Sequence, residues 1–172
     1  LFAKFLGAGL PILAHANGDA AADLFVNALN RSIDMSSIPD HRTVMIHAQT
    51  VREDQLDIMA EMKAIPSFFS AHTFYWGDWH RDSVFGEERA SRISPTQSSL
   101  DKGIVFTVHN DSPVVPPDMI RLLWATTNRL TRSGQVLGQE QRISTLDAIK
   151  AVTINAAYQY FEEDKKGTID VG

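Results

Sequence analysis

The chain has 172 residues, of which 44% are hydrophobic and 22% are charged, which is typical of one globular domain and excludes a wholly disordered chain. Sixteen lysine and arginine residues against 21 aspartate and glutamate residues give a formal net charge of −5, and without a basic block we expect no nucleic-acid partner. Cysteine is absent, which excludes disulfide bonds, cysteine-ligated zinc and a thiol nucleophile.

The opening segment, residues 1–16, is nearly apolar but contains Lys4 and is too short to span a bilayer. It also lacks the order of basic, apolar and small residues that marks a signal peptide. We therefore expect no membrane partner. Composition does not fix the compartment, and the cytoplasm is our expectation.

Short apolar runs alternate with amphipathic stretches along the chain. The runs predict strands at residues 10–14, 43–46, 65–69 and 104–108. Helical spacing and N-terminal capping residues predict helices at 19–31, 50–63, 94–103, 118–130 and 144–160. Residues 71–86, rich in aromatic side chains, are predicted to form a long loop. Continuous apolar strands separated by helices indicate an α/β fold with a parallel sheet that is buried on both faces.

Each predicted strand leads into a polar segment that contains one of the six histidines of the chain. These segments read HANGD from residue 15, HAQT from 47, SAHT from 70 and HNDSP from 109. Because the carboxyl ends of parallel neighbours lie side by side, we expect His15, His47, His72 and Asp111 to converge. Imidazole and carboxylate are ligands that zinc and similar divalent ions take, and such a site is suited to hydrolysis of a carbonyl compound or to deamination.

Other residues near these strand ends have both a functional and a structural interpretation. Asn17, two residues after His15, is a candidate for orienting substrate. The aromatic segment 68–80, which includes Trp76, is a candidate wall for an apolar or aromatic substituent. Alternatively, these rings cover the mouth of the fold and pack on a neighbour, and a single histidine at a strand end is commonly a hydrogen-bonded structural residue.

Four segments in this order resemble the amidohydrolase superfamily: HANGDAAADLFVNAL, VMIHAQTVREDQLDIMAEM, IPSFFSAHTFYWGDWH and FTVHNDSPVVPPDMIRLLWA. Within it, the chain is similar to the branch that includes the N-substituted formamide deformylases, amidohydrolase family 3. The resemblance covers nearly the whole chain. It implies part of a TIM-like (β/α)8 barrel, about strands 5 to 8 with their helices. Residues 1–163 would be the C-terminal half of this barrel, and residues 164–172 would begin a segment that leads to a small β-domain.

The resemblance also implies roles for individual residues. His15 and His47 match the metal-binding histidines of the fifth and sixth strands. Asp111 matches the aspartate of the eighth strand, which is both a metal ligand and the catalytic base that activates water. His72 falls where the family can place a group that contacts substrate, and we add Asn17 and Trp76 to this substrate-binding set. The implied cofactor is a divalent metal, for which we expect zinc, as one or two ions.

The chain departs from the family pattern in what it lacks. The His-x-His motif of the first strand and the lysine of the fourth strand have no counterpart in it, and Lys4 lies too close to the fifth-strand segment to supply the latter. We therefore expect the chain alone to be inactive. The predicted edge strands, 10–14 and 104–108, would be open to pairing with the missing half of the barrel or with a second copy.

The favoured function is a metal-dependent hydrolase that acts on a non-peptide C–N bond, an amide, of a small molecule through a metal-activated water. In one alternative, the protein has the same site but is a metal-dependent deaminase that acts on a heterocyclic amine. The other is a catalytically inactive α/β fragment that packs with or completes another chain.

Overall fold

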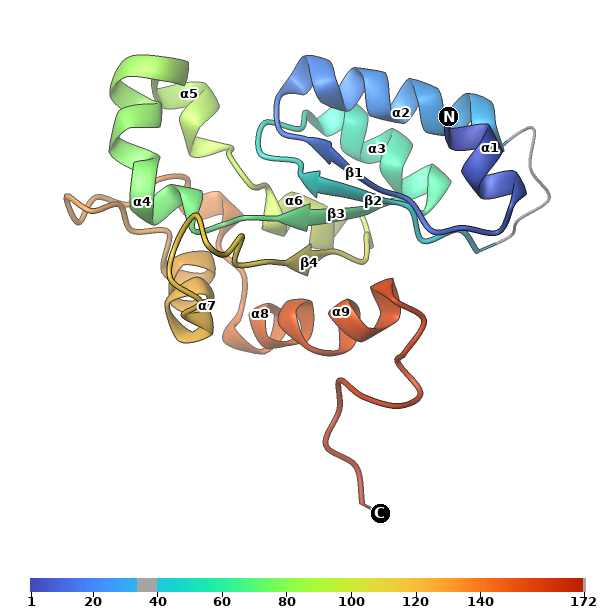
Figure 1. Cartoon of the computed structure of the whole chain (residues 1–172). Coiled ribbons are helices and arrows are strands. Elements are labelled where there is room, and N and C mark those ends of the chain that lie inside the picture. The colour runs from blue at the N-terminus through green and yellow to red at the C-terminus, as the bar shows by residue number, and fades with distance from the viewer. Residues whose placement is uncertain (34–39, 172) are drawn as a thin grey trace.

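A sheet of four parallel strands forms the centre of the computed structural model, which describes residues 1–33 and 40–171 (Figure 1). The strands are β1 (Leu13–Ala16), β2 (Val44–His47), β3 (Ile65–Phe68) and β4 (Thr107–Val108). Their order in the sheet, β1-β2-β3-β4, is their order along the chain. Each connection therefore leads to the next neighbour, as in a segment of a barrel, and the predicted parallel α/β fold is confirmed.

Helices occupy both sides of this sheet and the region beyond the carboxyl ends of its strands. They are α1 (Phe2–Gly7), α2 (Asp19–Ile33), α3 (Glu53–Met62), α4 (His72–Trp79), the π-helix η1 (His80–Phe85), α5 (Gly86–Ser91), α6 (Thr96–Asp101), α7 (Met119–Asn128), the 3-10 helix η2 (Gln139–Gln141), α8 (Thr145–Val152) and α9 (Ile154–Gln159). In Figure 1, α2 and α3 lie above the sheet, α8 and α9 lie below it, and α4, α5 and α7 lie beyond the strand ends. Among the described residues, no helix is long and apolar enough to cross a lipid bilayer.

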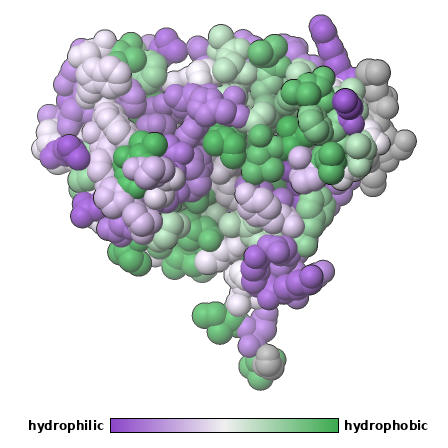
Figure 2. Space-filling model, viewed as in Figure 1, coloured by the Kyte–Doolittle hydropathy of each residue, from purple (hydrophilic) through white to green (hydrophobic). Residues whose placement is uncertain are grey.

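The apolar runs predicted as strands supply the centre of the core. Met45, Phe68 and Phe106 are fully or almost fully buried, and they belong to one cluster with Leu29 and Leu56 from the covering helices. Burial of a side chain of this kind stabilises a fold by roughly 1.5–3 kcal/mol. The edge strand β1 is less well covered, because Leu10 and Leu13 remain 49% and 42% exposed. Figure 2 shows hydrophobic residues on the face where β1 and α1 lie.

The aromatic segment predicted as a loop is helical, and this prediction was wrong. Residues 72–91 form α4, η1 and α5. The apolar periodicity is weak because aromatic rings occupy more than one side of the helix: Phe74 meets Trp124 of α7 at a centroid distance of 5.6 Å, whereas Trp76 meets Phe69 at 6.1 Å. Gly77 allows the close approach of Thr131, whose Cγ2 would lie 2.8 Å from an added Cβ.

Two further boundaries differ from the sequence prediction. The helix predicted over 144–160 is broken at Thr153, where φ is −122° and ψ is −93°, into α8 and α9. The predicted strand 104–108 pairs with β3 only over Thr107 and Val108. No glycine or proline lies next to Thr153, so the local sequence contains no signal for the break between α8 and α9.

Arg42 anchors the C-terminal helix α9 to the start of β2. Its guanidinium lies 3.8 Å and 3.9 Å from the ring centroids of Tyr158 and Phe161. It also forms ion pairs with Asp40 at 3.0 Å and Glu163 at 2.8 Å. A buried guanidinium held by rings and carboxylates has few alternative positions, so it fixes the end of α9 against the sheet.

Arg129 organises the segment that follows α5. Its side chain is fully buried and donates to the carbonyl oxygens of Leu137 at 2.8 Å, Ile93 at 2.7 Å and Ser94 at 3.2 Å. Burial lowers the pKa of Arg129 to about 10, so the group is charged at neutral pH. The Ser94 amide donates in turn to the Gln49 carbonyl at 2.8 Å, in the loop after β2. Arg129 thus connects the turn after α7 with the rim of the sheet.

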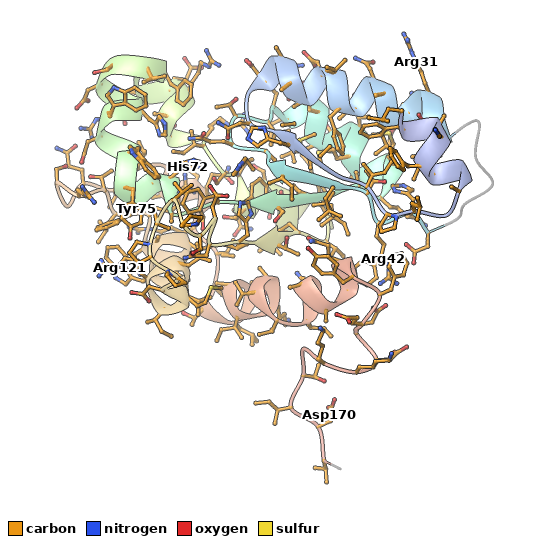
Figure 3. All side chains as sticks on the ribbon, in the orientation of Figure 1. Arg31, Arg42, His72, Tyr75, Arg121 and Asp170 are labelled. Carbon is orange, nitrogen blue, oxygen red and sulfur yellow. The ribbon has the colours of Figure 1, made fainter. Side chains whose placement is uncertain are left out.

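We expect Arg129→Met to lower the free energy of unfolding by about 3 kcal/mol or more, because several buried carbonyl groups lose their donor at once. Urea unfolding of the complete protein measures this difference. The matched control is Arg31→Met, which changes an exposed arginine of α2 (Figure 3) and should stay within about 0.5 kcal/mol of the wild type. A loss below about 1 kcal/mol in Arg129→Met would contradict the role given to this residue.

Candidate metal centre

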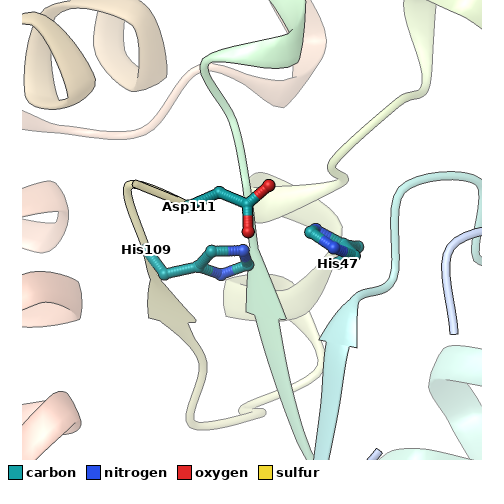
Figure 4. A group of neighbouring side chains, drawn as sticks. All are labelled: His47, His109 and Asp111. Carbon is teal, nitrogen blue, oxygen red and sulfur yellow. The ribbon is translucent and has the colours of Figure 1, made fainter. Parts of the chain in front are cut away.

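Three side chains that can bind a metal lie together at the carboxyl ends of β2 and β4 (Figure 4). His47 is the last residue of β2, His109 directly follows β4, and Asp111 comes two residues later. Each offers one ligand atom, and these atoms all lie within 4.8 Å of one another. The three groups come from chain positions up to 64 residues apart, and the parallel sheet brings them to one edge.

The backbone at this edge departs from ordinary strand geometry. His47, Ala48 and Asp111 have φ values of 75°, 47° and 60°, in the left-handed region. Residues other than glycine adopt this region at a cost of roughly 1 kcal/mol or more, and such residues concentrate at functional sites. The extended backbone of β2 therefore ends at His47, and that of β4 ends before Asp111.

Burial keeps the imidazoles of this group neutral. It lowers the pKa of His47, an effect that the nearby His15 reinforces and the Asp111 carboxylate opposes. It also lowers the pKa of His109 to about 4, with a further contribution from His47. Neutral imidazole is the form that offers a lone pair to a metal ion.

Two buried nitrogen atoms of the group have no hydrogen-bond partner. They are Nδ1 of His47 and Nε2 of His109. Buried polar atoms in folded proteins almost always have partners, and an unpartnered one calls for an explanation such as an ion. Two neutral imidazoles with free nitrogens and one carboxylate form a donor set that fits a divalent metal of the zinc type.

The structure brings two of the other predicted site residues next to this group. The ring of His15 lies 4.6 Å from that of His47, edge to face, and His15 is exposed. His15 is not one of the three residues whose ligand atoms share the 4.8 Å cluster. The ring of His72, at the start of α4, lies 5.9 Å from that of His47.

Asn17 and Trp76 lie in the surrounding shell. The Asn17 Oδ1 atom is buried without a partner, and the Asn17 carbonyl accepts a hydrogen bond from the Thr50 amide at 3.2 Å. Trp76 is half-buried on α4, 5.7 Å from the ring of His72. The catalytic, metal-binding and substrate-binding roles of the six residues predicted from the sequence stay predictions.

His109 is the member of the cluster to which the sequence analysis assigned no role. Its segment was singled out because it contains Asp111, yet the histidine two residues earlier went unassigned. The usable signal was the position of His109, which directly follows a predicted strand as His15 and His47 do.

The fold and the cluster together define a class: an α/β protein built as part of a (β/α)8 barrel, with metal-ligand side chains at the carboxyl ends of its strands. Comparison with known families is consistent with this class and more specific. The model of the amidohydrolase family matches residues 1–172, and the chain belongs to this family.

Individual relatives agree with the assignment. The chain is 22% identical over 164 residues to an N-substituted formamide deformylase from Arthrobacter pascens. The matched region covers 95% of this chain and 30% of the relative. It is 27% identical to the solved structure of an uncharacterised metal-dependent hydrolase from Pyrococcus furiosus, with a TM-score of 0.77, over 95% of this chain and 32% of the other. An adenosine deaminase from Xanthomonas campestris with bound zinc shares the fold at 15% identity and a TM-score of 0.65, over 99% of this chain and 38% of the other. The chain thus spans about a third of the length of these relatives.

The acid sensitivity of the site can be predicted for His72. Burial, reinforced by His80 and His47, lowers the pKa of His72 to about 3, whereas a histidine in an unfolded chain titrates near 6.5. Between these values the unfolded state binds more protons than the folded state. The free energy of unfolding therefore falls as the pH drops from about 6.5, by up to about 1.4 kcal/mol per pH unit from this group.

We expect His72→Gln to weaken this dependence. Urea unfolding of the complete protein at several pH values between 7 and 4 compares the two slopes. A slope in the variant equal to that of the wild type would show that His72 does not titrate in this way.

Proposed function

We propose that the complete protein is a metal-dependent hydrolase that cleaves a non-peptide C–N bond, an amide, in a small molecule. The observation that carries this proposal is the cluster of His47, His109 and Asp111 at the strand ends of an amidohydrolase-family fold. The cluster lies where (β/α)8 enzymes place their reactive groups.

The proposed metal ligands are His47 and Asp111, with His15 from the family resemblance and His109 from the structure. A divalent metal, when bound, polarises a carbonyl oxygen and lowers the pKa of water toward neutrality. Zinc suits this mixture of imidazole and carboxylate donors. Either one or two ions are compatible with the proposal.

The chain's own residues supply the remaining functions in this proposal. The Asp111 carboxylate accepts a proton from the attacking water and passes it to the leaving nitrogen. His72, neutral and with a buried Nδ1 that has no partner, is placed to hydrogen-bond the substrate. Trp76 and Phe69, with ring centroids 6.1 Å apart, form an apolar surface beside His72. Asn17, whose Oδ1 is also unpartnered, orients the substrate from the loop after β1.

The site also requires further ligands and strands. β1 and β4 each have one neighbour in the described sheet, and we propose that their free edges pair with additional strands, from a longer polypeptide or a second copy of the chain. Those strands would complete both the barrel and the ligand set. In this proposal the chain alone is inactive.

We expect Asp111→Asn to lower the turnover of the complete protein by roughly 10²–10⁴-fold, because the amide cannot accept the proton. A panel of small amides and heterocyclic amines serves as substrate, and carboxylate and ammonia are both quantified, since ammonia release from the amines would support deamination instead. The control is Asp101→Asn on the exposed surface of α6, which should retain full turnover. Near-normal turnover in Asp111→Asn with an unchanged fold would remove Asp111 from its role.

We expect the purified complete protein to contain a stoichiometric divalent metal that is measured by elemental analysis. His47→Ala should weaken its binding at least 10-fold, because one ligand is lost, and the role proposed for His15 predicts the same loss in His15→Ala. The control is His41→Ala, which changes a buried histidine near the amino end of β2, where it contacts the Met62 carbonyl at 2.7 Å. Absence of metal from the wild-type protein would favour the alternative in which this α/β chain is catalytically inactive.

A further inference from the structure

A row of buried polar side chains connects His109 to helix α9 by way of β3 and β4. His109 Nδ1 lies 2.9 Å from Ser67 Oγ of β3. Ser67 Oγ lies 2.8 Å from Thr107 Oγ1 of β4, which lies 2.8 Å from Gln159 Oε1 of α9. Ser67, Thr107 and Gln159 are only 2%, 3% and 6% exposed. We call this row the Gln159 relay.

The chemistry of Gln159 Oε1 decides the direction of the hydrogen bonds in the relay. A carbonyl oxygen only accepts, so Thr107 must donate its single hydroxyl hydrogen to Gln159. Thr107 Oγ1 is then the acceptor for the Ser67 hydroxyl, and Ser67 Oγ is the acceptor for His109 Nδ1–H. The opposite direction would leave two lone pairs facing each other across 2.8 Å between Thr107 and Gln159.

This direction determines which nitrogen of His109 carries the proton. With the hydrogen on Nδ1, the lone pair of the neutral ring is on Nε2. That nitrogen is the buried atom without a partner. Figure 4 shows the end of the ring away from its attachment turned toward Asp111 and His47.

We propose that Gln159, Thr107 and Ser67 are positioning residues that hold His109 as the Nδ1–H tautomer, with the Nε2 lone pair directed at the metal centre. The inference rests on the proposed function in one respect, namely that a metal binds at the cluster. Groups that fix the tautomer and orientation of a metal-binding histidine typically change metal affinity 10–100-fold when they are removed. Helix α9, anchored by Arg42 beside Tyr158, supplies the acceptor that sets the direction of the relay.

The experiment measures Zn²⁺ affinity of the complete protein by competition with a chelator, together with the tautomer of His109 by ¹⁵N NMR. Thr107→Val removes the hydroxyl and nearly conserves volume, and we expect it to weaken Zn²⁺ binding 10–100-fold. Thr107→Ser restores the hydroxyl and should bind within about threefold of the wild type, since the relay is rebuilt. The matched control is Thr43→Val, which changes a fully buried threonine directly before β2 whose hydroxyl contacts His41 instead of the relay, and it should bind Zn²⁺ like the wild type.

The outcomes separate this inference from the proposed function. Wild-type affinity in Thr107→Val, with binding lost in His47→Ala, would overturn the relay and leave the metal centre intact. An equal loss in Thr107→Val and Thr43→Val, or failure of Thr107→Ser to restore binding, would show a general packing effect and overturn the relay. Protonation of His109 at Nε2 in the metal-free wild-type protein would overturn it without any variant. A wild-type protein that binds no Zn²⁺ would overturn both proposals.

Discussion

The parallel register of β1 to β4 is the constraint on which the candidate site depends. Ala16 pairs with His47, His47 with Phe68, and Phe68 with Val108, so the last residues of four strands lie in one line across the sheet. His47, the last residue of β2, therefore lies close to His109, the residue after β4, with their ring centroids 5.0 Å apart. A slip of one residue in any pair would turn His47 or His109 to the opposite face, because side chains alternate along a strand.

Bringing several histidines together at the strand ends costs free energy, because their charged forms repel one another and the backbone is strained. The ring centroid of His47 lies 5.0 Å from that of His109 and 5.9 Å from that of His72, and three imidazoles this close in a buried region cannot all carry charge. Burial and mutual repulsion lower the pKa values of these three histidines, and left-handed backbone at His47 and Asp111 adds strain. A folded protein retains unpartnered nitrogens and strain of this kind where a ligand or a reaction uses them.

Support for the site comes from both ends of the sheet. On the carboxyl side, Arg129 and the Ser94–Gln49 contact connect the rim to the helices beyond it. On the amino side, Arg42 fixes the end of α9, and Gln159 of α9 reaches the interior next to Thr107. The hydrogen bonds behind His109 thus begin on a helix about 50 residues further along the chain. Local sequence around His109 contains no sign of this connection.

The pattern of residues along the chain predicted the fold class, the approximate positions of the strands and the segments that meet at the site. Apolar runs of four or five residues can be buried only between helices, and histidine after each run was sufficient to place His15, His47, His72 and Asp111 near one edge. The aromatic segment was misjudged because its rings pack on different partners and so show no helical period. The folded structure was needed to show that His109 joins His47 and Asp111, and that Ser67, Thr107 and Gln159 form hydrogen bonds behind it. Hydrogen bonds and ligand geometry depend on distances across the sheet, which no pattern along the chain specifies.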